Sequence, residues 1–298
     1  MYSVFAVDPE SIDSWESLRY IVEKFGYSRG LLIARYPKRW KKMVMEACLA
    51  NGVGEYELKH IEEKLSLIKN DRLYRMGLPY AEPSWIDNVS QPEVLKCFDA
   101  VLIKGARAGG KFHDVISVDE ELFEGQREMR VKRTALNLAT VAKRLLSEVA
   151  TVVLVDPYFR PEPKCLKVLC ELVTASKARG KGVTQVVIYV ALSKSPEPKD
   201  ALEGLYRESL ADLISGGLKL SICRVKDKEI DFDFHARYLL TEKGGLRYDR
   251  GFIEPNDRSQ RNHKTDVTCM DNQLVAELRD HYRDDLTGIL SIDSLQIA

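Results

Sequence analysis

The sequence has little of what most metal centres need. Its 298 residues include five histidines and six cysteines, and no two cysteines stand at the C-x2-C spacing of a zinc site. Cys165 and Cys170 are five residues apart in a segment expected to be helical. The spacing predicts no metal or other cofactor, and we expect reduced thiols that pack as small apolar side chains in an intracellular protein.

Net charge and long apolar runs are also missing. The 45 basic residues balance 45 acidic residues, so no global field attracts nucleic acid, and any polyanion site must be a local patch. No apolar run reaches the roughly 18–20 residues that a membrane helix needs, so no membrane span is expected. The N-terminus lacks the basic and then apolar layout of a signal peptide, which favours a cytoplasmic location.

Residues 1–112 are expected to form a smaller N-terminal α+β domain of unknown role. Apolar periodicity and capping residues predict helices at 13–26, 37–52 and 55–70, and strands at 30–36 and 99–105. The glycine-rich stretch 105–111 has neither P-loop nor dinucleotide-fold spacing, so we expect a turn there. Residues 113–126 are expected to connect this domain to the next.

The layout of residues 127–298 predicts a second domain in which helices and strands alternate. We expect helices at 127–150, 163–180, 199–217 and 272–286, and strands at 151–159, 184–192 and 218–225. The strand TVVLVDPYF is apolar throughout, as strands buried on both faces of a sheet are. This alternation predicts an α/β fold in which helices flank both faces of a mixed sheet.

A histidine and an arginine stand two residues apart in the segment DFHARYLLTEKGG. If the segment is a strand, His235 and Arg237 share a face and point into one cleft. An imidazole can attack phosphorus as a nucleophile, and a guanidinium matches phosphate oxygens. Glu242, beside the glycine turn, would orient an imidazole or hold a basic neighbour. The alternative is an ordinary sheet edge, with Arg237 paired to Asp231 or Asp233.

The pattern H-x-R-x4-E resembles the H-x-K-x4-D motif of the phospholipase D superfamily, with Arg237 in place of lysine and Glu242 in place of aspartate. The preceding VVLVDPYF is similar to a strand in one branch, whose relatives include prokaryotic defence-associated proteins and a lipid-binding domain. The resemblance covers roughly residues 127–298. The superfamily's G-S-x-N element is replaced by RGFIE, so its serine and asparagine are absent.

The resemblance implies a metal-independent phosphodiesterase, a nuclease that works through a phosphohistidine in prokaryotic defence or DNA processing. His235 would be the nucleophile, Arg237 the phosphate clamp and Glu242 the orienting carboxylate. The family uses two histidines, so a single motif implies a homodimer in which two copies of His235 meet. His263 is an alternative acid within one chain. Other proteins of a defence system would be further partners.

A basic cluster between residues 243 and 264 favours nucleic acid as the substrate. The candidate substrate-binding residues are Asp156, Tyr158, Lys243, Arg250, His263 and Lys264. Asp156 would either line the cleft or cap the turn at Pro157, and Tyr158 would either stack on a base or pack at the rim of the core. A second hypothesis is a catalytically inactive module that binds phosphodiesters, as nucleic acid or phospholipid head groups.

Overall fold

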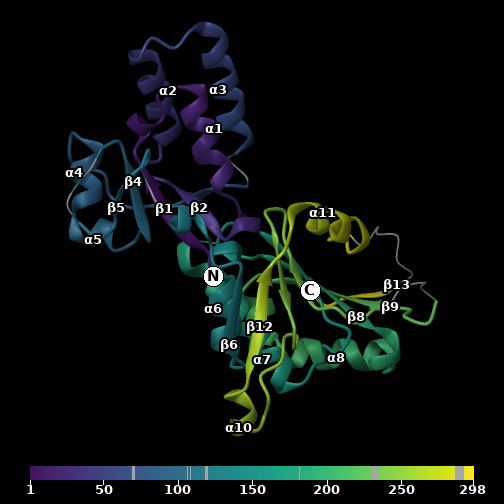
Figure 1. Cartoon of the computed structure of the whole chain (residues 1–298). Helices are drawn as coiled ribbons and strands as arrows, with labels where there is room; N and C mark the ends of the chain where they lie inside the picture. The colour runs from purple at the N-terminus through teal and green to yellow at the C-terminus, as the bar shows by residue number, and fades with distance from the viewer. Residues whose placement is uncertain are drawn as a thin grey trace. The chain divides into compact units, whose positions relative to one another are not determined.

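The computed structural model describes residues 1–68, 71–105, 107, 109–117, 120–180, 182–229, 234–285 and 292–298. The chain divides into two compact units, one spanning Tyr2–Arg127 and the other containing Glu128–Ala298 (Figure 1). Residues 113–126, expected as a connector, lie within the first unit. Among the described residues, no helix combines the length and apolar character that crossing a membrane requires.

The N-terminal unit is built on a five-stranded parallel sheet. Its strands, in the spatial order β3-β2-β1-β4-β5, are β1 (Ser3–Val7), β2 (Leu31–Arg35), β3 (Leu73–Arg75), β4 (Ala100–Ile103) and β5 (Phe112–Asp114). Every pairing between these strands is parallel. Parallel neighbours require crossover connections, which are usually helical. The unit is therefore α/β, and the expected α+β class is wrong.

Helices connect these strands and bury their apolar faces on the sheet. They are α1 (Trp15–Lys24), α2 (Trp40–Ala50), α3 (Glu55–Leu67), α4 (Trp85–Ser90) and α5 (Pro92–Leu95). The first three share one core with Phe5, Val7 and Ile33, which lie on the same face of the sheet. The indole Nε1 of Trp40 donates a 2.7 Å hydrogen bond to the carbonyl of Val7 and so ties α2 to the end of β1.

The C-terminal unit contains an eight-stranded mixed sheet. In the order β13-β9-β8-β7-β10-β11-β12-β6, its strands are Ile292–Gln296, Lys219–Val225, Gln185–Ala191, Thr151–Val155, Tyr238–Leu240, Gly245–Tyr248, Lys264–Cys269 and Glu128–Lys132. Strands β7, β8 and β9 are parallel to one another. All other neighbours pair antiparallel. The expected mixed α/β sheet is confirmed.

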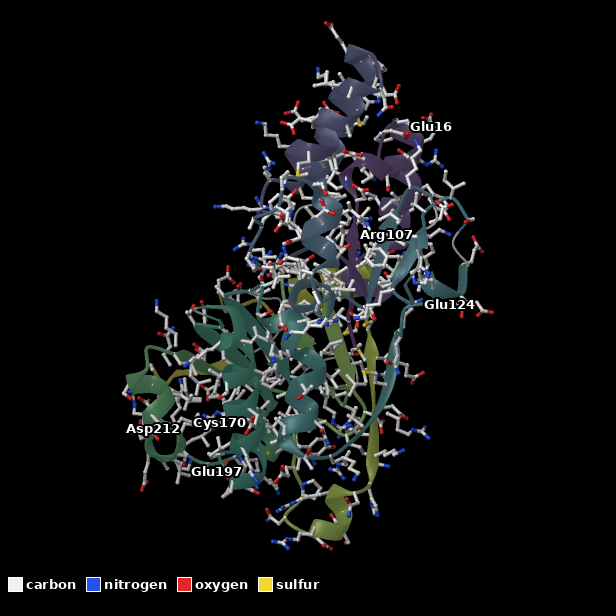
Figure 2. The ribbon with its side chains drawn as sticks, turned by 90° about the vertical axis from the view of Figure 1, so that its left-hand side faces the viewer. Glu16, Arg107, Glu124, Cys170, Glu197 and Asp212 are labelled. Carbon is white, nitrogen blue, oxygen red and sulfur yellow. The ribbon has the colours of Figure 1, made fainter. Side chains whose placement is uncertain are left out.

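Helices cover both faces of this sheet, as expected. On one face, α6 (Ala135–Leu146) and α7 (Pro163–Ser176) enclose the side chains of Val152, Leu154 and Leu239. On the other, α11 (Asn272–His281) packs its Val275 among Val153, Val155 and Leu240. The remaining helices include α8 (Lys199–Ser209), α9 (Ala211–Ser215) and α10 (Arg258–Arg261). All six cysteines are free, and Cys170 lies half-buried on α7 (Figure 2).

Two expected helices of this unit are wrong in part. Within 127–150, the first residues form the edge strand β6, and Thr134 caps a helix that begins only at Ala135. Exposed and half-buried residues alternate along β6, which is the period of a strand. The expected helix at 272–286 ends at His281, and β13 follows it as the edge strand beside β9.

Glu254 joins three elements of the unit and is buried. Its carboxylate accepts hydrogen bonds from the backbone N–H of Ala135 at 2.7 Å and from Lys167 Nζ at 2.6 Å. Arg261 Nε lies 3.6 Å away. Burial raises the pKa of Glu254. The hydrogen bonds from Lys167 and Ala135 together outweigh this effect, so the pKa lies below its usual value. Glu254 thus links the start of α6 to α7 and α10.

We expect Glu254→Gln to lower the free energy of unfolding at pH 7 by about 1–3 kcal/mol, because charge-assisted hydrogen bonds are lost inside the protein. A depressed pKa stabilises the folded state above about pH 4.5, the unfolded value, and this is lost as the pH falls. The difference between parent and variant should therefore shrink in acid. Urea unfolding followed by circular dichroism measures it. As the control, Glu203→Gln removes only a surface pair with Arg207 and should change the free energy of unfolding little. If the two variants lose the same stability, the prediction is wrong.

Candidate functional site

The chain that leads into β10 returns to the edge of the sheet where β7, β8 and β9 end. Because β10 is antiparallel to β7, Tyr238 lies opposite Val155, and the residues just before Tyr238 lie beside Asp156 and Tyr158. Ligands of α/β sheets collect beyond the carboxyl ends of the parallel strands. Figure 1 places α10 at the end of β12 that corresponds to this edge and α11 at the other.

His235 lies in an exposed turn ahead of β10, and not within a strand as expected. Its Nδ1 is 3.3 Å from the hydroxyl oxygen of Tyr158. The two rings are nearly parallel, with 8° between their planes and 6.3 Å between their centroids. Tyr158 therefore orients the imidazole by a hydrogen bond and by ring contact.

Arg237 is half-buried and shares the same tyrosine. Its guanidinium carbon is 5.2 Å from the centre of the Tyr158 ring, a cation–π distance. One terminal nitrogen donates a 3.1 Å hydrogen bond to the carbonyl of Asp249, and Nε is 4.0 Å from Asp156 Oδ1. His235 and Arg237 are thus brought together through Tyr158. The alternative partners of Arg237, Asp231 and Asp233, lie outside the described residues.

Asp156 is fully buried beneath this group. Its carboxylate accepts hydrogen bonds from the backbone N–H groups of Tyr158 and Phe252, each at 3.0 Å. Burial raises the pKa of Asp156, while these two bonds and the charge of Arg237 oppose the rise. Asp156 therefore caps the turn after β7, one of its two expected roles, and it faces Arg237 from beneath with no exposed surface of its own.

Two further residues of this site carry no signal in the motif around His235. Gly251 has a φ of 70°, and a Cβ there would lie 2.4 Å from Asp156 Oδ2 and 3.3 Å from Arg237 Cγ. Lys194 is exposed just beyond β8, with its Nζ 5.6 Å from the centre of the Tyr158 ring. A search for polar residues at the ends of neighbouring parallel strands would have found Lys194. Three cationic or protonatable groups therefore surround one tyrosine.

Glu242 and Lys243 do not belong to this group. They lie in the turn between β10 and β11, at the opposite end of β10 from His235. About 15 Å of extended chain separates Arg237 from Glu242. Lys243 faces Glu148, with 3.8 Å between Nζ and Oε2. The expected role of Glu242 as the carboxylate that orients His235 is therefore wrong for this chain, and the Tyr158 hydroxyl occupies that position.

The other expected residues lie on or beside the first residues of β12, away from the Tyr158 group. Arg250 follows Asp249, the residue that holds Arg237, and its backbone N–H donates to Thr265 Oγ1 at 3.2 Å. Lys264 and His263 are the next residues outward from Thr265. The carbonyl of His263 accepts a hydrogen bond from the backbone of Arg133, so His263 belongs to this outer end and is not part of the Tyr158 group.

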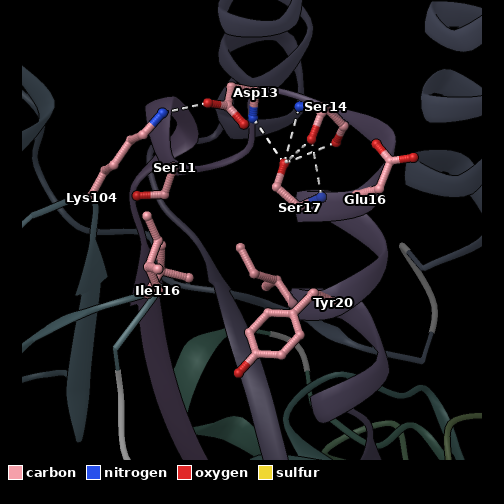
Figure 3. A pocket seen from close by; sticks show the side chains of 10 residues that line it. Ser11, Asp13, Ser14, Glu16, Ser17, Tyr20, Lys104 and Ile116 are labelled. Atoms are coloured by element: carbon pink, nitrogen blue, oxygen red, sulfur yellow. Dashed lines mark hydrogen bonds and ion pairs between the residues drawn. The ribbon is translucent and has the colours of Figure 1, made fainter.

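The parallel sheet of the N-terminal unit has cavities at its own carboxyl edge. The strand order reverses between β1 and β4, which is where ligands of such sheets bind. One cavity of about 480 Å³ is bordered by Ser11, Tyr20 and Lys104, whose amine points toward Asp13 in Figure 3. A second of about 650 Å³ includes Asp8 and Lys104. The sequence analysis assigned no role to this edge.

Asp8, at the end of β1, carries a perturbed carboxyl group. Burial is the main reason that its pKa rises from 3.8 to about 6; the charge of Glu10 adds to the rise, and a hydrogen bond from the Glu10 N–H opposes it. The folded unit therefore binds more protons than the unfolded chain between about pH 4 and 6. The stability that Asp8 contributes is present in full below about pH 4 and falls as the pH rises through this window.

We expect Asp8→Asn to remove this fall and to raise the free energy of unfolding at pH 7.5 by about 1–3 kcal/mol. All three tryptophans belong to this unit, so their fluorescence during urea unfolding at pH 4 to 7.5 reports it. Asp114→Asn is the control of opposite sign, since hydrogen bonds from Ile116 and Gly105 lower that pKa. A variant at Asp8 that follows the parent across the pH range would contradict the prediction.

Gly251→Ala is expected to displace Asp156 and Arg237 and to lower the free energy of unfolding by about 2–4 kcal/mol, because strain at positive φ adds to the contact with the buried carboxylate. Gly217→Ala is a matched control: its φ is 85°, but its Cβ would meet nothing within 4 Å. Its cost should be about 1 kcal/mol. If both variants lose the same free energy of unfolding in urea, the contact with Asp156 does not contribute to the cost, which contradicts the prediction.

No protein-family model and no curated protein matches this chain. The resemblance to the phospholipase D superfamily therefore rests on the residues quoted from the sequence, and it stays a prediction. The geometry around Tyr158 stands independently of that resemblance.

Proposed function

We propose that the C-terminal unit is a metal-independent phosphodiesterase that cleaves nucleic acid with His235 as its nucleophile. The observation that carries the proposal is the convergence of His235, Arg237 and Lys194 on Tyr158, at the carboxyl edge of the parallel strands. Such a group attracts an anion, and it offers both a nucleophile and a fixed guanidinium to a phosphodiester. Nothing in this chemistry needs a phospholipid's apolar tail.

The contact between His235 and Tyr158 supports a defined role for each imidazole nitrogen. When the Nδ1–H donates to the phenol oxygen, Nε2 carries the lone pair. Nε2 would then form a bond to phosphorus while the bond from phosphorus to the leaving oxygen breaks. Arg237 would stabilise the charge that gathers on the phosphoryl oxygens. Water would later attack the phosphohistidine, release the phosphate product and restore the imidazole.

The leaving oxygen needs a proton, and in this proposal a second copy of the chain supplies it. A twofold axis would place the His235 of each copy on opposite sides of one phosphodiester. His263 is the alternative acid, although it belongs to the outer end of β12. The setting in prokaryotic defence, with other defence proteins as partners, stays a prediction that rests on the resemblance alone.

One observation favours a second candidate, a phosphate-binding module without catalysis. The turn that replaces G-S-x-N offers no hydroxyl or amide side chain near the site, because Gly251 lies against Asp156 and the side chain of Phe252 is buried. The N–H of Phe252 is already bonded to Asp156. Arg237 would still bind phosphate in such a module, and His235 would act only as a further donor.

Cleavage of DNA and RNA in excess chelator tests the proposal. We expect the parent to cleave and His235→Ala to lose about 10³-fold or more of the rate, because the nucleophile is gone. His281→Gln, in α11, should cleave at the parent's rate. If His235→Ala cleaves as fast as the parent, catalysis by this site is ruled out. If the parent binds without cleaving and Arg237→Ala does not bind, the module without catalysis is the correct function.

A further inference from the structure

Arg133 is a half-buried arginine whose guanidinium has no counterpart among the described residues. It stands between β6 and α6, and its Nε is buried without a hydrogen-bond partner. Only its backbone N–H is engaged, with the carbonyls of Arg261 and His263. A guanidinium withdrawn from water normally needs bonded acceptors.

Arg224 differs from Arg133 in its terminal nitrogens, although its Nε is also buried without a hydrogen-bond partner. Its terminal nitrogens bind the carbonyls of Ser195 and Glu197, and they pair with the carboxylate of Asp293 (Glu197 is labelled in Figure 2). The Nε of each arginine is buried without a hydrogen-bond partner, but among the described residues only Arg224 has acceptors on its terminal nitrogens. The terminal nitrogens of Arg133 are therefore left for an anion from outside the chain.

Arg133 lies near one arginine and one aspartate of the loop that follows β11. Burial, and then the charge of Arg250, lower the pKa of Arg133, and only Asp249 acts in the opposite direction. Asp249 is itself engaged by Arg250, with 3.3 Å between the carboxylate and Nε. The carboxylate of the nearby Asp266 is paired with Arg130. The acidic side chains close to Arg133 are thus already occupied.

Two lysines extend this cationic surface. Lys132 and Lys264 lie directly opposite each other across β6 and β12, and both are exposed. Like charges in facing positions of an antiparallel pair are destabilising. Arg133 follows Lys132 in the chain, and the backbone N–H of Arg250 contacts Thr265, which follows Lys264, so four cations lie along this end of β6 and β12. An anion bound at this end would reduce the repulsion.

The cluster adjoins the site around Tyr158 through one residue. The carbonyl of Asp249 binds Arg237, its carboxylate pairs with Arg250, and its charge opposes the fall in the pKa of Arg133. Two cationic positions therefore adjoin Asp249. One contains Arg237 and the nucleophile His235, and the other contains Arg250 and Arg133. A polymer with repeated phosphates can occupy both positions, whereas a lipid head group with a single phosphodiester fills only one.

We propose that Arg133 and Arg250 form a second phosphate subsite, which binds the phosphate next to the one held by His235 and Arg237. This inference rests on the proposed function and identifies its substrate class as a polynucleotide. Contacts of this kind position the chain without reading its sequence. The subsite would thus hold the backbone in register with the nucleophile.

The salt dependence of binding tests the subsite without relying on catalysis. With a labelled 20-nucleotide single strand, Arg133→Gln and Arg250→Gln should each reduce the slope of log K against log[salt] by about 0.7, the value for one lost phosphate contact. Affinity at 0.1 M salt should fall several-fold. Arg207→Gln, on a surface helix, is the control and should keep the parent's slope. Arg250 is exposed, so its variant remains informative if Arg133→Gln does not fold.

A small diester separates this inference from the function on which it rests. Hydrolysis of bis(p-nitrophenyl) phosphate needs the His235 position alone, so it reports whether that position is intact in each variant. Parent-like salt slopes in both variants, together with intact hydrolysis, would overturn the subsite and leave the phosphodiesterase standing. Reduced slopes in a protein that hydrolyses nothing would support the subsite and reject catalysis. Binding to anionic phospholipid vesicles but not to the oligonucleotide would overturn the inference.

Discussion

The arrangement of the C-terminal site depends on one constraint, the need to satisfy the buried carboxylate of Asp156. A carboxylate withdrawn from water is costly unless donors surround it. Two backbone N–H groups supply those donors, and they fix the turn after β7 and the turn that follows β11. Gly251 allows the second turn to approach, and Arg237 supplies the nearby positive charge. The position of Tyr158, and through it of His235, follows from these contacts.

Much of the architecture was predictable because long apolar strands and amphipathic helices dominate it. The strands at 151–159 and 184–192 and the helix at 163–180 correspond to β7, β8 and α7. The shorter or more polar strands were missed. β6 consists largely of residues that also favour helices, and only its pairing with β12 decides its state. β3 has only three residues and precedes a proline-rich stretch, so its sequence pattern is too short to predict a strand.

The site was predictable in its composition and less so in its geometry. The expectation that His235 and Arg237 lie close together agrees with the structure, but a shared tyrosine and not a shared strand face joins them. Glu242 was assigned by counting residues along a motif, and counting does not reveal that β10 carries the chain away from the site. Arg133 lacked any local signal, because its surroundings come from β11 and β12.

The residues around Tyr158 come from parts of the chain that are far apart, and this bears on the order in which the protein acquires its site. The contact between Tyr158 and His235 spans 77 residues, and the bond from Phe252 to Asp156 spans 96. Contacts of such separation form only after the intervening strands and helices have been ordered. During synthesis, a chain released short of residue 252 would contain the parallel strands and still lack one of the two backbone donors to the carboxylate of Asp156 at their edge. The sheet is therefore a precondition of the site, and the site is among the last features of the unit to form.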